Sequence, residues 1–346
     1  MMLSHNPIVE PFALAHATIV TGDKAGTILR NMTIVVGADG RIEQVAPSIE
    51  TSIPAEYHYL DGTGKIVMPG LINAHTHLFS QGKPLNPKLA TPKGQRMVAT
   101  FAHSPLGKPY MAATVKHNAT TLLESGVTTI RTLGDVGYEV VTLRDQIDAG
   151  QILGPRILAS GPLMAIPEGH GAPLIALTSG TPEEARTAVA QNLKAGVNAI
   201  KIAATGITDI QLENSKNVVG GMVSGARQAH EAGLMIGVGT DTGMTFVPQY
   251  ATWRELELLV AYAGFSPAEA LHAATAVNAS ILGADAETGS LEVGKSADLL
   301  VLNANPLDDL RALEHPALVI AAGHPVWRPG PKRFADIDAL LDEAYA

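Results

Sequence analysis

The stretch IVMPGLINAHTH, residues 66–77, ends an apolar, strand-like run with two histidines, His75 and His77. Alternate residues of a strand project from the same face, so both imidazoles are expected to point the same way. Two neutral imidazoles at a strand end form half of a site for Zn²⁺ or a similar ion, and a protein-bound ion with an open position activates water for hydrolysis. The stretch therefore predicts a metal-dependent hydrolase, against the alternative of a surface strand with two incidental histidines.

Two later segments strengthen the metal-site hypothesis. Lys201 lies inside the otherwise apolar run VNAIKIA, and Asp241 ends the apolar run LMIGVGTD. A lysine in a buried strand is costly unless its charge is paired or removed, and carboxylation of Nζ by CO₂ would turn it into an anionic carbamate able to bridge two cations. An aspartate at a strand end can bind one ion and accept a proton from the bridging water. Together these four residues are a more specific signal than the histidine pair alone.

At these residues the chain resembles the amidohydrolase superfamily, in particular its peptidase-like branch of Xaa-Pro dipeptidases, arginine/lysine carboxypeptidases and imidazolonepropionase-related proteins. The resemblance spans nearly the whole chain and rests on six motifs: PGLINAHTH (69–77), GVTTIR (126–131), AIKIAATG (199–206), GVGTDTG (237–243), SPAEALHAAT (266–275) and GSLEVGKSADLLVL (289–302). It implies an α/β fold with a (β/α)₈ TIM-type barrel and a small β-sandwich formed by both termini.

The resemblance also implies roles for the four polar residues. His75, His77, Lys201 and Asp241 would be the metal ligands of two divalent ions, with zinc expected first and a CO₂-derived carbamate on Lys201. A metal-bridged hydroxide would attack the amide bond of a dipeptide or an N-acyl amino acid. Asp241 would be the catalytic residue that moves the proton to the leaving amine.

Two further residues are candidates for substrate binding. His170 follows the third expected strand in the loop PEGHG, and in the resembling enzymes a Gly-His-Gly loop at this place faces the site. The alternative is a solvated loop histidine. Arg131 ends the second expected strand and could pair with a carboxylate; a structural ion pair below the barrel mouth is the alternative.

One part of the family pattern is missing. The resembling enzymes carry two more metal-binding histidines, at the ends of the fifth and sixth barrel strands, whereas here only His230 lies between Lys201 and Asp241, at a predicted helix end closed by Gly233. A barrel allots about 30 residues to each strand-helix unit, so the fourth and eighth strands should lie about 120 residues apart. Lys201 and Asp241 are 40 positions apart. We therefore count five units where closure needs eight.

The missing three strand-helix units have two explanations. Either the sequence joins two pieces around an unrecorded segment, or the polypeptide has lost three strands and keeps unpaired sheet edges that favour aggregation. We favour a join, with Gly206–Ile207 as the first choice and a position near Gly233 as the second. With a join, the two further histidines exist; without one, the chain lacks two metal ligands.

Composition restricts the class of protein. The 346 residues carry a net charge of −9 with no basic stripe and contain no cysteine, so a nucleic-acid partner, a disulfide framework and a thiolate metal site are not expected. No apolar run reaches the roughly 20 residues of a membrane span, and the N-terminus lacks the layout of a signal peptide. We expect a cytoplasmic enzyme with a small peptide-like or amide substrate, no membrane partner and a possible homo-oligomer.

The order of the segments predicts two domains. Strand-like segments at both ends predict a β-sandwich domain over residues 1–67 and 289–346, around a metal-dependent hydrolase barrel domain over residues 68–288. Residues 78–110, which are rich in proline and glycine, are expected to form a long irregular loop beside the site.

Two alternative functions stay open at this point. One is a single-metal deaminase or cyclic-amide hydrolase of the imidazolonepropionase type, against which Lys201 argues because single-metal relatives generally lack the bridging carbamate. The other is an inactive relative, which follows if the barrel is truly truncated. The number of metal ions bound per chain separates the three hypotheses.

Overall fold

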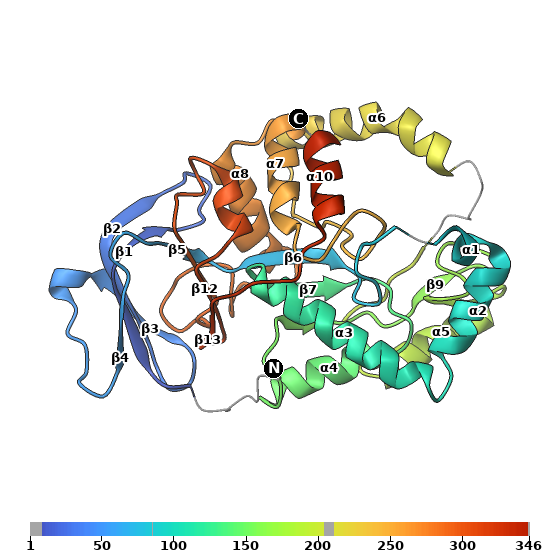
Figure 1. The fold of residues 1–346 in the computed structure, drawn as a ribbon, viewed down its shortest axis with the longest axis horizontal. Helices are drawn as coiled ribbons and strands as arrows, with labels where there is room; N and C mark the ends of the chain where they lie inside the picture. Colours follow the sequence, from blue (N-terminus) through green and yellow to red (C-terminus); the bar gives the residue numbers. More distant parts are fainter. Residues whose placement is uncertain (1–8, 85, 204–210, 345–346) are drawn as a thin grey trace.

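The computed structural model describes residues 9–84, 86–203 and 211–344, whose arrangement is shown in Figure 1. A β-sheet built from both ends of the chain lies on one side, and a region of parallel strands and helices makes up the rest. The α/β class expected from the sequence is confirmed, with both parallel and antiparallel pairing.

Strands from both ends of the chain form one eight-stranded sheet with the order β13-β12-β11-β5-β1-β2-β3, and β4 pairs with β1. The strands are β1 (Phe12–Val20), β2 (Ile28–Val36), β3 (Ile42–Pro47), β4 (His58–Asp61), β5 (Ile66–Pro69), β11 (Leu299–Leu302), β12 (Leu318–Ala321) and β13 (His324–Trp327). β5 joins the two ends, because it pairs parallel with β1 and antiparallel with β11. The predicted two-layered sandwich stays a prediction, as does the domain boundary after residue 67, a position inside β5.

Three parallel strands form the centre of the α/β region: β6 (Leu71–Thr76), β7 (Val127–Thr132) and β8 (Arg156–Leu158). The segment that ends at Asp241 lies along the free side of β6, where the amide of Ala74 donates to the carbonyl of Val238 at 2.9 Å. A parallel bridge joins Thr76 to Thr242. This segment therefore takes the place of a strand next to β6.

On the other side, the chain turns from β8 into β9 (Leu163–Ala165), which pairs with β10 (Ala176–Thr178). A parallel bridge joins Met164 to Ile202, and the amide of Met164 donates to the carbonyl of Lys201 at 2.8 Å. The fourth strand expected from the sequence is thus an extended segment on this edge.

The described residues therefore fill five barrel positions, as counted from the sequence: β6, β7, β8 with its continuation β9, and the two edge segments 201–203 and 238–242. Between residue 203 and the segment that ends at Asp241, the described chain contributes one helix, α6 (Gln211–Glu231), and no strand. Since barrel closure needs eight units, the barrel is open between these two edges within the described ranges. The join at Gly206–Ile207 falls outside the described residues.

Helices lie around the parallel strands (Figure 1). They are α1 (Pro87–Ala90), α2 (Pro92–Ala102), α3 (Gly107–Glu124), α4 (Glu139–Asp148), α5 (Pro182–Lys194), α6, α7 (Thr252–Ala263), α8 (Pro267–His272), α9 (Asn278–Ile281) and α10 (Ala335–Ala344). Apolar residues of α3, α7 and α8 pack on the strands and form the main core, for example Leu122, Leu256 and Leu271. No helix among the described residues is both long and apolar enough to cross a bilayer.

Residues 78–110 are not the irregular loop that the sequence predicts. Asn86 and Thr91 cap α1 and α2, accepting from the backbone amides of Lys88 and Gly94. Each cap is followed by a proline in the first helical turn, where its fixed φ favours helix and no amide is missed. The prolines therefore start helices here instead of breaking them.

Candidate metal centre

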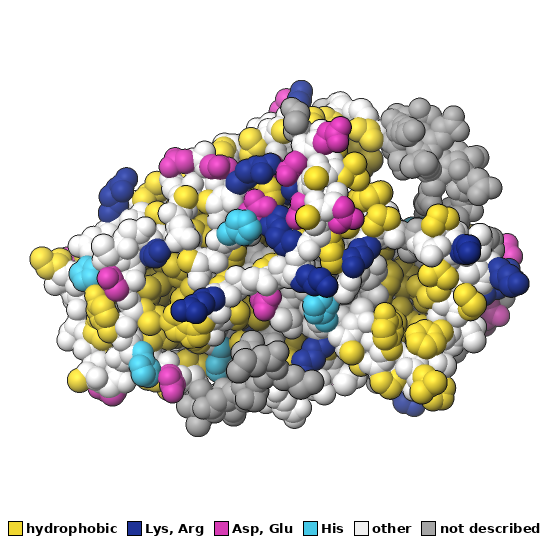
Figure 2. Space-filling model, viewed as in Figure 1, with side chains coloured by type: hydrophobic (Ala, Val, Ile, Leu, Met, Phe, Trp, Pro, Cys, Tyr) yellow, Lys and Arg dark blue, Asp and Glu magenta, His cyan; other side chains and the backbone are white. Residues whose placement is uncertain are grey.

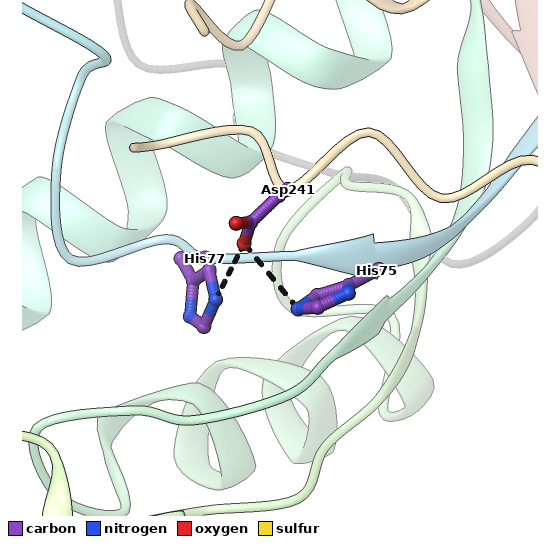
Figure 3. A group of neighbouring side chains, drawn as sticks. All are labelled: His75, His77 and Asp241. Atoms are coloured by element: carbon purple, nitrogen blue, oxygen red, sulfur yellow. Dashed lines mark ion pairs between the residues drawn. The ribbon is translucent and has the colours of Figure 1, made fainter. Parts of the chain in front are cut away.

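The structure brings His75, His77 and Asp241 together at one end of the parallel strands (Figure 3). His75 belongs to β6 and His77 directly follows it, so strand alternation places both rings on one side. Asp241 comes from the neighbouring segment, and its amide donates to the carbonyl of His75 at 2.9 Å. Backbone pairing between these two segments therefore sets the relative positions of the three side chains.

Asp241 has a strained backbone. Its φ is +58°, in the left-handed region that few residues other than glycine adopt. Residues held in such conformations cluster at functional sites, where the surrounding structure over-determines them. Figure 3 shows that the Asp241 carboxylate points toward the two rings.

One carboxylate oxygen faces both imidazoles. Oδ1 of Asp241 lies 2.9 Å from Nε2 of His77 and 3.3 Å from Nε2 of His75. Nδ1 of His77 lies 2.8 Å from the carbonyl oxygen of Gly134, which can only accept, so Nδ1 carries the ring proton. In the neutral ring Nε2 then presents a lone pair to Oδ1, which is buried without a hydrogen-bond donor. A cation between these atoms would satisfy all three, so the residues fit a divalent metal ion.

The protonation states favour metal binding. Burial lowers the pKa of His75 to about 4, so its ring is neutral at pH 7. Burial by itself would raise the pKa of Asp241, but the hydrogen-bond contact with His77 and the nearby charge of Lys201 oppose it and lower this pKa. A neutral imidazole and an ionised carboxylate are the forms that coordinate a cation.

A cavity of about 640 Å³ opens above the three residues. Lys201 and His170 line it, together with apolar side chains that include Phe79, Leu163 and Ile175. This volume lies within the range of small-molecule sites. The structure therefore gathers five of the six predicted site residues around one cavity.

Arg131 is the exception. It does not line the cavity, and its Nε donates to the carbonyl of Ala74 at 2.9 Å, between β7 and β6. Burial lowers the pKa of its guanidinium group. These contacts are those of a residue that ties two strands together, and its predicted role in substrate binding stays a prediction.

His230 does not contribute to the centre. Its ring stacks on Phe265 at 4.1 Å between centroids, and Nε2 lies 3.6 Å from Oε2 of Glu269. Phe265 lies in the turn between α7 and α8, and Glu269 belongs to α8. The prediction that this histidine ends a helix and lies away from the strand ends is confirmed.

Sequence reasoning missed the residues that hold His77 in place. The amide of Gly134 donates to Oγ of Ser160 at 2.9 Å, and Oδ2 of the fully buried Asp135 accepts from Oγ1 of Thr132 at 2.8 Å. Burial raises the pKa of Asp135 to about 7. This network fixes the loop whose carbonyl selects the tautomer of His77. The available signal in the sequence was Asp135, which follows the second strand by three residues in the segment TLGD.

The family of the chain follows from its sequence. The family model described as amidohydrolase family matches residues 66–218 and 211–326. These ranges cover most of the chain, which therefore belongs to the amidohydrolase family. The two matches meet at residues 211–218, in the part of the chain where the barrel units are missing.

Curated relatives match over shorter stretches. An imidazolonepropionase of Symbiobacterium thermophilum is 41% identical over 78 residues, which is 22% of this chain and 18% of the relative. An ochratoxinase of Aspergillus niger is 38% identical over 103 residues, which is 30% of this chain and 20% of the relative. The matched part spans about a fifth of the length of these relatives.

Solved structures match over nearly the whole chain. A Bifidobacterium longum protein described as a candidate prolidase is 71% identical, with a TM-score of 0.86 over 98% of this chain and 100% of its own. A Xaa-Pro dipeptidase with bound methionine has a TM-score of 0.73 at 21% identity, covering 92% of this chain and 100% of its own. The second likeness concerns the fold alone.

Proposed function

We propose that the chain is a metal-dependent amidohydrolase that cleaves the amide bond of a dipeptide or an N-acyl amino acid. The single observation that supports a metal is the contact of Oδ1 of Asp241 with Nε2 of His77 at 2.9 Å, because in a neutral His77 ring the proton lies on Nδ1 and a cation would then join these two atoms. His75, His77 and Asp241 would hold the ion, and Lys201, as a carbamate, would be a further ligand. A bound divalent cation supplies Lewis acidity and lowers the pKa of water.

The chain's own residues supply proton transfer. The side chain of Asp241 is 49% exposed, so part of it faces the cavity while Oδ1 faces the histidines. Its lowered pKa keeps it ionised, ready to accept a proton from the attacking water. The same carboxyl group would then deliver that proton to the leaving amine, as a general base that becomes a general acid.

The cavity supports an amide substrate with apolar parts. Phe79, Leu163 and Ile175 offer apolar surface close to the metal ligands, which excludes water from the reacting bond. His170 lies in an exposed loop at the cavity wall, where it can contact a polar group of the substrate. The similarity to a Bifidobacterium longum protein described as a candidate prolidase favours a dipeptide.

A second candidate function is a single-metal hydrolase of a cyclic amide, or a deaminase. The described residues offer one group of three metal-binding side chains, which suffices for a single ion. The local similarity to imidazolonepropionase agrees with a cyclic amide. The number of bound ions separates this candidate from the two-metal amidase.

The test is hydrolysis by protein that has been stripped with a chelator and reloaded with Zn²⁺, Mn²⁺ or Co²⁺. Xaa-Pro dipeptides, N-acyl amino acids and a cyclic amide are offered as substrates, and bound metal is counted by mass spectrometry. Asp241→Asn should lower kcat by a factor of about 10³ or more and retain much of the metal, because proton transfer is lost. The control is Asp285→Asn, which changes an exposed aspartate that does not line the cavity and should keep wild-type activity.

Three outcomes contradict the proposal in part or whole. Near-normal kcat of Asp241→Asn with metal bound would remove Asp241 from catalysis. Cleavage of only the cyclic amide with one ion per chain would select the second candidate. If the reloaded protein binds no metal and hydrolyses none of the substrates, the chain is an inactive relative.

A further inference from the structure

A second cavity of about 750 Å³ lies apart from the metal centre, between α3, α4 and the loop that precedes α4. Its apolar floor is formed by Met111, Val136, Leu143, Ile152 and Leu177. This volume falls within the range of small-molecule sites, which are mostly apolar with a few polar groups.

An apolar cluster separates this cavity from the candidate metal centre. Met111 and Val136 line the second cavity, Leu163 and Ile175 line the first, and all four belong to one buried cluster. None of the three grouped metal-binding residues lines the second cavity. The second cavity is therefore a distinct place on the molecule, and an inference about it does not rest on the proposed function.

Two lysines stand at the rim of the second cavity. Lys108 and Lys116 both line the cavity from α3, where they are eight positions apart, which is about 80° around the helix and about 12 Å along its axis. Neither side chain takes part in any ion pair found among the described residues, unlike Arg144 and Arg186, which pair with neighbouring carboxylates. Two cations without counter-charges beside an apolar floor favour an anionic ligand.

The absence of acidic residues around α3 also favours an anionic ligand. The sequence from residue 62 to residue 123 contains no aspartate or glutamate, although the whole chain carries a net charge of −9. This acid-free segment, residues 62–123, includes α1, α2 and nearly all of α3. Figure 2 shows Lys and Arg side chains beside apolar ones over the α1–α3 part of the molecule. From the α3 side of the cavity, a negatively charged ligand therefore meets no carboxylate of residues 62–123.

One carboxylate does line the cavity. Oε1 of Glu139 accepts from the backbone amide of Gly137 at 3.2 Å, so this side chain is held toward its own loop. Tyr138, another lining residue, donates its hydroxyl to Oδ1 of Asn192 at 2.8 Å. Both side chains thus have partners within the protein, whereas the two lysines are left for a ligand.

From these contacts and charges we propose that the cavity between α3 and α4 binds a small carboxylate with an apolar chain. The carboxylate is held between Lys108 and Lys116, and the chain lies on the floor around Met111 and Leu143. Charge-assisted contacts to an ammonium group are stronger than those between neutral groups, and burial of each methylene adds affinity. Binding should therefore need both the anionic head and the chain.

The test is calorimetric titration of the 346-residue chain with octanoate, octylamine and butyrate. We expect one saturable site for octanoate, butyrate binding at least about 10-fold more weakly because four methylenes are missing, and no saturable binding of octylamine. Lys108→Gln with Lys116→Gln should weaken octanoate binding about 10-fold or more. The control pair Lys88→Gln with Lys93→Gln removes two lysines of the acid-free segment that do not line the cavity, and should change affinity less than about 2-fold.

Ala113→Trp provides a second variant, because Ala113 is an exposed lining residue whose enlargement fills the cavity without disturbing the core. It should abolish octanoate binding while the unfolding transition stays unchanged. Equal binding of octanoate and octylamine, unchanged affinity in the Lys108/Lys116 pair, or absence of saturable octanoate binding would each overturn the proposal.

Discussion

The two sides of the open barrel differ in burial although their sequences are similarly apolar. On the paired side, Leu71 and Ile130 are 0% exposed between neighbouring strands and helices. On the open edges, Ile202, Leu234 and Met235 are 67%, 63% and 66% exposed. The comparison shows that apolar side chains of the edge segments stay exposed where no further described strand covers them, whereas Val238, which lies beside β6, is 1% exposed.

The candidate metal centre combines residues from the paired side and from the open edges. His75 and His77 come from the paired side, whereas Asp241 and Lys201 come from the two edge segments. Each edge segment pairs with a described strand on one side, through an isolated bridge and two or three backbone hydrogen bonds. The metal ligands are therefore positioned with unequal rigidity, and the following experiments measure that inequality.

The largest expected difference is in stability. Ile130→Ala should lower the free energy of unfolding by about 2–5 kcal/mol, because it leaves a cavity in a close-packed core. Ile202→Ala removes the same atoms from an exposed side chain and should change it by less than about 0.5 kcal/mol. Urea unfolding of both variants checks this, and similar losses would show that the 201–203 edge is covered in solution.

A smaller effect is expected from the loop that holds His77. Ser160→Ala leaves the buried amide of Gly134 without its acceptor and should weaken Zn²⁺ binding about 10- to 100-fold. Ser125→Ala is the matched control, because its buried hydroxyl donates to the carbonyl of Leu122 away from the site. Metal competition titrations measure both affinities, and ¹⁵N NMR of His77 reports its tautomer. Equal Zn²⁺ affinity in the two variants would show that the loop held by Ser160 does not affect metal binding.

Site residues could be predicted from the sequence where local strand geometry positions them, and not where contacts between distant loops do. The alternation in NAHTH places two imidazoles on one face, and the residue that ends LMIGVGTD joins them, so the three grouped ligands were predictable. The network of Ser160, Gly134 and Asp135 was not, because it depends on contacts between loops that follow different strands. The helices within residues 78–110 were missed because prolines that start helices resemble prolines that break them.

A pH-dependent effect is expected for His75 in metal-free protein. Its folded pKa, about 4, lies below the ordinary value of 6.5, so the unfolded chain binds the extra proton between these pH values. The stability contributed by the neutral ring is present above pH 6.5 and is lost as the pH falls toward 4. His75→Asn should reduce this loss by roughly 1–2 kcal/mol, a figure discounted for partial exposure.

Urea unfolding at pH 7 and pH 4.5 measures the loss for the wild type and for the variant. The control His117→Asn changes an exposed histidine of α3 and should keep the wild-type dependence. The same loss in His75→Asn as in the wild type would contradict a buried neutral His75.

The smallest effect on stability is expected at the edge beside Asp241. Leu234→Ser with Met235→Ser should change the free energy of unfolding by less than about 0.5 kcal/mol but reduce self-association, because unpaired edges with exposed apolar residues favour aggregation. Light scattering over a range of protein concentrations checks this. Unchanged self-association would show that this edge does not mediate contacts between copies.

The most direct test of the central claim is the calorimetric titration of chelator-stripped protein with Zn²⁺, beside the variant His77→Ala with Asp241→Ala. We predict at least one ion bound per chain in the wild type and loss of that binding in the variant, because the two substitutions remove the atoms that meet at 2.9 Å. Absence of Zn²⁺ binding in the wild type, or unchanged binding in the variant, would contradict a metal centre at these strand ends.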